Sequence, residues 1–192
     1  RLPETKNPGL LELMSQNGLY PKEVTAHQFG FVLGPCLNAG GRLDTAMRSL
    51  ELLLSEDRDR EAVIAAELID LNRSRKAMTE EAEEEAVCLV ETSKLKEDRV
   101  LVVYLPECHE SLAGLVAGRL QKKYHKPAFV LTRTVEGVKG SGRSIEAYSM
   151  YEELCGVRDL LSKFGGHPMA AGLSLSEQDV PVLRRRLNEQ CT

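Results

Sequence analysis

The strongest constraint on the fold is a helical pattern that runs without a break from Asp57 to about Asp98. Neither proline nor glycine interrupts this stretch, and its charged residues crowd one face. Its apolar residues recur at spacings of three, four and seven, as a helix requires. They are Ile64, Leu68, Leu71, Met78, Ala82, Ala86 and Leu89. At 1.5 Å per residue the helix would span on the order of 60 Å, which is too long for one small core. We therefore predict a connector helix over residues 55–98 that joins two lobes.

The pattern changes after Arg99. An apolar run rich in β-branched residues at 100–105 predicts a buried strand, residues 110–124 a helix, and residues 127–131 a second strand. A strand, a helix and a strand of these lengths indicate a right-handed parallel βαβ unit. Further on, we predict a third strand at 137–145, helices at 149–154 and 157–164, and a short strand at 173–175 before a last helix. The fold class predicted is therefore α/β, with a small mixed sheet flanked by helices.

The composition limits the classes of function. The 192 residues carry a formal charge of −4, from 25 basic and 29 acidic residues, which argues against a protein that coats nucleic acid over its whole surface. A local basic groove is still compatible with that balance. No apolar run approaches the roughly 20 residues of a membrane helix. The five cysteines are scattered and lack CxxC spacing, so we expect reduced thiols in a cytoplasmic protein and no zinc site.

The first glycine-rich cluster reads GSGRS, from Gly140 to Ser144. Two hydroxyls and a guanidinium suit a phosphate, and the glycines let the backbone approach a ligand. If the segment is a strand, Ser141 and Arg143 point to one face and Ser144 to the other. The alternative is a turn or bulge with an exposed arginine, and from spacing alone it is as well supported.

The second cluster is Gly165-Gly166-His167, followed by Pro168. We expect a tight turn here, with an imidazole that could donate to a phosphate oxygen or serve a hydrolytic site. The alternative is a structural histidine. None of the four histidines has the spacing of a metal site such as HExxH.

The third cluster contains Asn38 and Arg42, four residues apart among small residues. If they lie in a loop loosened by glycine, Arg42 can meet an anion near the start of the next helix, for which Asp44 is the predicted N-cap. The alternative is an ordinary helix entry with an exposed arginine.

Together these clusters resemble one family. The segments from Pro35 to Leu43 (PCLNAGGRL), from Gly140 to Ser144 and from Phe164 to Gly172 (FGGHPMAAG) are similar to those of the RecJ single-strand-specific 5′→3′ exonucleases, in the DHH phosphoesterase superfamily. The segment from Cys108 to Leu120 is similar to the first helix of that family's DHH-associated domain. The resemblance covers nearly the whole chain.

The resemblance implies an organisation and a set of roles. Residues 1–54 would be the end of the DHH lobe and a linker, 55–98 the connector helix, and 99–192 the DHH-associated domain that binds substrate. His167 would be catalytic. The implied substrate-binding residues are Asn38, Arg42, Ser141, Arg143, Ser144, Gly165 and Gly166.

The resemblance also implies an enzyme that uses two divalent metals. The Asp-His-His motif of the superfamily is absent from this sequence. We therefore expect Mn²⁺ or Mg²⁺ to be held by an N-terminal lobe outside this chain, no metal ligand within it, and no activity of the chain alone. The implied partners are single-stranded DNA and a single-strand-binding protein, in DNA repair and recombination, without a membrane.

Three other interpretations stay open. The first is a relative in the same superfamily that degrades short oligonucleotides or dephosphorylates a nucleotide. The second is a DHH-associated lobe that only binds RNA, as beside alanyl-tRNA synthetase, although the linker with Arg42 argues against it. The third is a homologue that has lost its chemistry, against which the intact GSGRS and GGH clusters weigh.

Overall fold

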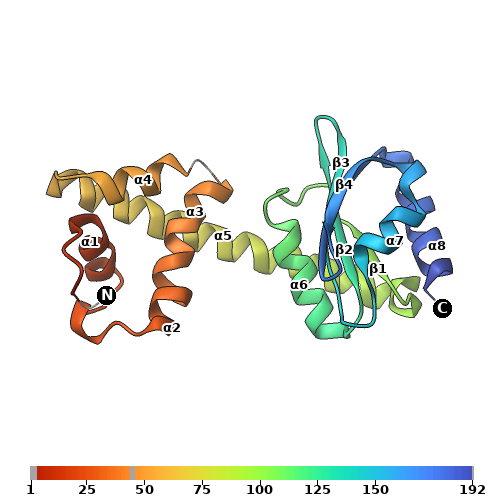
Figure 1. Cartoon of the computed structure of the whole chain (residues 1–192), viewed down its shortest axis with the longest axis horizontal. Coiled ribbons are helices and arrows are strands. Elements are labelled where there is room, and N and C mark those ends of the chain that lie inside the picture. The colour runs from red at the N-terminus through yellow and green to blue at the C-terminus, as the bar shows by residue number, and fades with distance from the viewer. Residues whose placement is uncertain (1–3, 44–45, 192) are drawn as a thin grey trace. The chain divides into compact units, whose positions relative to one another are not determined.

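The computed structural model describes residues 4–43 and 46–191, which form two compact units, Arg1–Met78 and Thr79–Thr192 (Figure 1). Asp44, the predicted N-cap, lies outside the described residues. None of the helices in the described ranges combines the length and apolarity needed to cross a bilayer.

The first unit is helical. Its elements are α1 (Pro8–Gln16), a 3₁₀ turn (Pro21–Glu23), α2 (Ala26–Gln28), a π-helical segment (Phe29–Leu33), α3 (Gly34–Leu43), α4 (Met47–Leu54) and the first part of α5 (Arg58–Thr92). Asn7 caps α1 by accepting a hydrogen bond from Leu10 N–H at 2.9 Å, and its amide donates to Leu53 O at 2.7 Å. One side chain thus both starts α1 and ties it to α4. The core beneath contains Leu13, Met14, Leu33, Leu52, Ile64 and Leu68.

The segment from Ala26 to Leu43 is helical throughout, so Asn38 and Arg42 lie in a helix and not in a loop. Pro35 has no N–H to donate, and its ring would crowd the preceding turn of a regular α-helix. The backbone widens there into a π turn, in which Gly34 N–H bonds to Phe29 O, five residues back. The proline is therefore accommodated without ending the helix.

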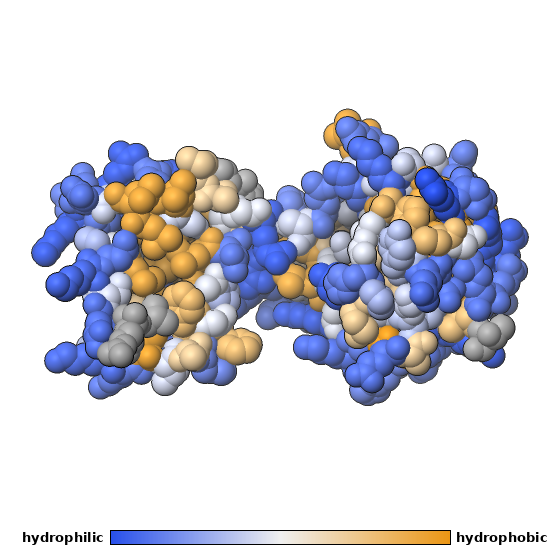
Figure 2. Space-filling model, viewed as in Figure 1, coloured by the Kyte–Doolittle hydropathy of each residue, from blue (hydrophilic) through white to orange (hydrophobic). Residues whose placement is uncertain are grey.

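Part of the surface of this unit is apolar. Figure 2 shows apolar side chains gathered on its visible face. The large apolar residues exposed in this unit are Tyr20, Phe31, Met47, Leu50, Leu54, Val63 and Met78. Exposed apolar surface of this kind is typical of faces that another part of a protein or a partner covers.

The second unit holds one mixed sheet. It contains the last part of α5, a 3₁₀ turn (Lys94–Glu97), β1 (Leu101–Tyr104), α6 (Ala113–Tyr124), β2 (Ala128–Thr134), β3 (Gly137–Arg143), α7 (Met150–Gly156), a 3₁₀ turn (Arg158–Leu160), β4 (Leu161–His167), β5 (Ala170–Leu175), a 3₁₀ turn (Glu177–Asp179) and α8 (Val180–Gln190). The strand order is β1-β2-β3-β5-β4. β1 and β2 are parallel and the other pairs antiparallel, which confirms the α/β class and the parallel βαβ unit.

The two faces of the sheet are covered differently. α7 and α8 pack on one face, over a core that includes Phe129, Leu131 and Leu173. On the other face, α5 and α6 cover β1 and β2, over a core that includes Val103, Val116 and Val130. Figure 1 shows α6 on one side of the sheet and α7 and α8 on the other. On the α6 side, β5 and β4 are left open to solvent.

The predicted helix at 157–164 is wrong, because only Arg158–Leu160 makes a short turn and β4 begins at Leu161. The apolar residues Leu160, Leu161 and Phe164 have a helix-like spacing, but the segment pairs with β5 through a turn at Pro168 and Met169. A bulge between Leu161 and Lys163 disturbs the alternation that would have indicated a strand. Long-range pairing thus overrides the local pattern here.

A pair of glycine substitutions tests the packing of this sheet. An added Cβ at Gly142 would lie 2.6 Å from Met150 Sδ and 2.7 Å from Phe129 Cδ1, whereas one at Gly165 meets no atom within 4 Å. We expect Gly142→Ala to lower the free energy of unfolding by about 1–3 kcal/mol, because the core must shift to admit it. The matched Gly165→Ala is expected to leave stability almost unchanged. Denaturant unfolding of both variants measures this, and equal effects would contradict the packing described.

Candidate functional site

Nine residues of β3, β5 and β4 point to the side of the sheet that carries α6, and we call them the open face. Strand register arranges them in three rows, each crossing the three strands. The first row is Arg143, Ala170 and His167; the middle row is Ser141, Gly172 and Gly165; the third row is Lys139, Ser174 and Lys163. Cationic residues and the imidazole therefore stand on both sides of a middle row with almost no side chains.

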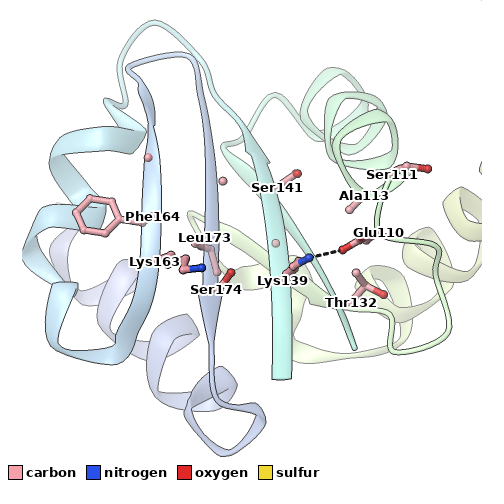
Figure 3. Close-up of a pocket in the computed structure, with 13 residues that line it drawn as sticks. Glu110, Ser111, Ala113, Thr132, Lys139, Ser141, Lys163, Phe164, Leu173 and Ser174 are labelled. Atoms are coloured by element: carbon pink, nitrogen blue, oxygen red, sulfur yellow. Dashed lines mark hydrogen bonds and ion pairs between the residues drawn. The ribbon is translucent and has the colours of Figure 1, made fainter. Parts of the chain in front are cut away.

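The middle row forms the floor of a groove. A Cβ at Gly165 would have no neighbour within 4 Å, and one at Gly172 would meet only Gly140 O, at 3.8 Å. These glycines therefore leave space instead of relieving a clash. The groove has a volume of about 500 Å³, and its lining includes Ser111 and Ala113 at the start of α6 (Figure 3). A backbone of sugar and phosphate could approach such a floor closely.

Arg143 packs against α6. Its Nη1 donates to Gly142 O at 2.8 Å, and a Cβ at Gly114 would lie 2.8 Å from its Nη2. A Cβ at Gly118 would lie 3.7 Å from Arg143 Cγ. Two glycines, one helical turn apart, thus make room for the arginine. Arg143 and Ser141 share one face of β3, as the alternation of a strand predicts.

His167 ends β4, and the turn expected at the GGH cluster follows it at Pro168 and Met169. Gly166 has φ +152°, and a Cβ there would lie 2.3 Å from Ala170 O, so this position requires glycine. The N–H of Met169 donates to His167 Nδ1 at 3.3 Å. In the neutral ring the proton is therefore on Nε2, which is left as a donor on an exposed side chain.

Ser144 is not on the open face. It is 4% exposed, its hydroxyl donates to Tyr148 O at 2.5 Å, and its N–H donates to Met169 O at 2.9 Å. The bond to Met169 O fastens the end of β3 to the hairpin turn, and the bond to Tyr148 O ties it to the segment before α7. The hydroxyl of Ser144, expected to bind substrate, is thus buried and already donating, and the role of this residue stays a prediction.

Lys139 and Lys163 also lie on the open face, and the sequence analysis did not identify them as site residues. Lys139 Nζ pairs with Glu110 Oε2 at 2.9 Å, and this hydrogen bond raises the pKa of the lysine (Figure 3). Lys163 is exposed and lines the same groove. Alternation on β3 could have revealed Lys139, two residues before Ser141. Lys163 was hidden by the mistaken helix at 157–164.

Asn38 and Arg42 lie on α3 of the first unit, four residues apart and therefore on one side of that helix. Asn38 is exposed and Arg42 is half-buried. The structure thus brings Ser141, Arg143, Gly165 and His167 to one surface in the second unit, with Asn38 and Arg42 in the first.

Within residues 4–43 and 46–191, no three His, Cys, Asp or Glu side chains are grouped so as to hold a metal ion. These residues do not fit a divalent metal, whose sites are built from several oxygen or nitrogen donors. What the open face can do chemically is bind an anion through a guanidinium, an imidazole, two ammonium groups and two hydroxyls.

Comparison with known proteins gives consistent results. Residues 97–192 match the DHHA1 domain family. The single-stranded-DNA-specific exonuclease RecJ of Bacillus subtilis is 41% identical over 191 residues, which are 98% of this chain and 24% of that protein. RecJ of Escherichia coli is 36% identical over 96% of this chain and 33% of its own length. The chain therefore spans about a quarter of the first relative and about a third of the second.

Solved structures show the same relation. A crystal structure of RecJ from Thermus thermophilus with Mn²⁺ matches 99% of this chain and 28% of its own, with a TM-score of 0.87 and 30% identity. A structure of RecJ bound to manganese matches 99% of this chain and 46% of its own, with a TM-score of 0.86. The chain is homologous to part of RecJ over nearly its whole length, and it belongs to the DHHA1 domain family.

Proposed function

We propose that this chain is the strand-holding part of a RecJ-like, metal-dependent 5′→3′ exonuclease that hydrolyses phosphodiester bonds of single-stranded DNA. The observation that carries the proposal is the open face, where two cationic rows border a floor of Ser141, Gly172 and Gly165. Homology to proteins described as single-stranded-DNA-specific exonucleases supports it. The placement of the site residues supports the roles proposed for them below.

Arg143 and Ser141 bind phosphates of the strand by charge-assisted hydrogen bonds. On α3, Arg42 binds a further phosphate and Asn38 orients the backbone around it. Gly165 and Gly166 let the strand come close, and Gly166 also sets the position of His167. His167 donates from Nε2 to a phosphate oxygen and offsets the charge that develops there during hydrolysis. None of these contacts reads a base, so binding is independent of sequence.

The metals belong to other residues of the full-length protein. Crystal structures of relatives contain Mg²⁺ or Mn²⁺, and the described part of this chain offers no donor cluster for either. The ion would polarise the scissile phosphate and activate water, while the open face holds the strand. A single-strand-binding protein is the proposed partner, in DNA repair and recombination. All five cysteines are free, in keeping with a reducing cytoplasm.

The first prediction concerns binding. We expect the chain to bind 5′-phosphorylated single-stranded DNA with an affinity that falls as salt rises, because phosphate contacts release counterions. Arg143→Ala should weaken binding about 10- to 100-fold and reduce the slope of log affinity against log salt by roughly 0.7. Fluorescence anisotropy across a salt series measures both. Affinity that does not change with salt would refute phosphate binding.

The second prediction separates the position of Arg143 from its charge. Gly114→Ala keeps every charge but places a methyl group 2.8 Å from Arg143 Nη2, so the flexible guanidinium must move. We expect binding to weaken at least about threefold while the folded state stays intact, because the crowded atom is the end of a long side chain. Circular dichroism and anisotropy on the same samples check this. Unchanged binding would show that the site does not depend on this placement.

The third prediction concerns catalysis. With Mn²⁺, the 192-residue chain alone should release no nucleotides from single-stranded DNA. In the full-length protein, His167→Gln should lower kcat by about 100-fold or more and change KM little, since the proposed contact strengthens in the transition state. Nucleotide release, followed by chromatography, provides the readout. A normal kcat in the full-length His167→Gln enzyme would show that His167 does not take part in the reaction.

A further inference from the structure

We propose that Lys139 and Lys163 form a second phosphate-binding row in the groove, and that Glu110 competes with the DNA for it. The inference rests on the proposed function and deepens it, because it extends the site beyond the residues around Arg143 and His167. The ligand is a further phosphate of the same single strand.

The register of β3, β5 and β4 determines where the lysine row lies. Ser174 of β5 pairs with Lys139 of β3 on one side and with Lys163 of β4 on the other. In the same way, Ala170 pairs with Arg143 and with His167. The two rows are four residues apart along each strand, which is about 13 Å at 3.3 Å per residue. A single phosphate group cannot touch both rows. A strand that lies along the groove therefore meets the two rows with different phosphates.

The groove joins the lysine row to the middle row of the open face. Lys139, Lys163 and Ser174 line the same cavity as Ser141, Gly165 and Gly172. The floor between the rows carries only a hydroxymethyl group and two glycines, so no bulky side chain separates the rows. Figure 3 shows Lys163 and Ser174 near each other across β4 and β5, with Lys139 facing Glu110. Along the direction of the strands, a cationic row thus stands on either side of an uncharged floor.

The carboxylate of Glu110 competes with a DNA phosphate for Lys139. Its Oε2 lies 2.9 Å from Lys139 Nζ, and it lines the same groove. The two side chains are 46% and 50% exposed, so the ion pair is screened by water and weak. A phosphate that binds Lys139 has to displace this carboxylate and also meets its repulsion. The pair keeps Lys139 positioned while the groove is empty and lowers the affinity for DNA.

The test uses the full 192-residue chain and two 5′-phosphorylated single-stranded probes, a dinucleotide and a hexanucleotide. NMR titration gives the Kd of each. We expect Lys163→Ala and Lys139→Ala to weaken hexanucleotide binding about three- to tenfold and dinucleotide binding hardly at all, because only the longer strand reaches the second row. Glu110→Gln, which keeps size and removes charge, should tighten hexanucleotide binding about two- to fivefold.

The control is Lys122→Ala, which removes one positive charge from an exposed residue in the last turn of α6, outside the groove lining. It should leave both Kd values almost unchanged. If the groove lysines act no differently from Lys122, or if Glu110→Gln weakens the hexanucleotide complex, the second row is refuted. If Arg143→Ala still weakens both probes, the proposed function survives that failure. If wild type binds neither probe, both proposals fall.

Discussion

Backbone pairing between β3, β5 and β4 is the constraint on which the site depends. In a sheet the side chains alternate between faces, so a shift of one residue in any of the three strands would turn its row residues into the core. The register observed puts Arg143, Ser141 and Lys139 on one face and Gly140 and Gly142 on the other. The second set must be glycine because Leu131, Phe129 and Met150 fill that side. Core packing therefore fixes which residues face the ligand.

Glycines serve opposite purposes on the two faces. At Gly142 and Gly166 a side chain would collide with the core or with backbone, so the residue is needed for the strands to come together. At Gly165 and Gly172 the space beyond the backbone is open, so glycine leaves room on the open face. At Gly114 the space is taken by the guanidinium of Arg143. The same residue type thus builds the sheet, opens the groove and positions its strongest cation.

Much of this could be predicted from the sequence, wherever the signal is local. The parallel βαβ unit follows from apolar runs and their spacing, and the shared face of Ser141 and Arg143 follows from alternation. Lys163 could not be found, because β4 is a strand only through its pairing with β5. The buried position of Ser144 depends on a hydrogen bond to Tyr148 O, and the helical setting of Asn38 depends on a π turn that accommodates Pro35. Such features arise from tertiary contacts or irregular backbone, which periodicity does not record.

The central claim is that phosphates of a single strand lie on the open face. The most direct test is an amide chemical-shift titration of the whole chain with 5′-phosphorylated single-stranded DNA. The account predicts that the largest shifts map to the amides of Ser141, Gly165 and Gly172, and that added salt reverses them. Shifts confined to the α7 and α8 side of the sheet, or no shifts on the open face while DNA is bound, would contradict it.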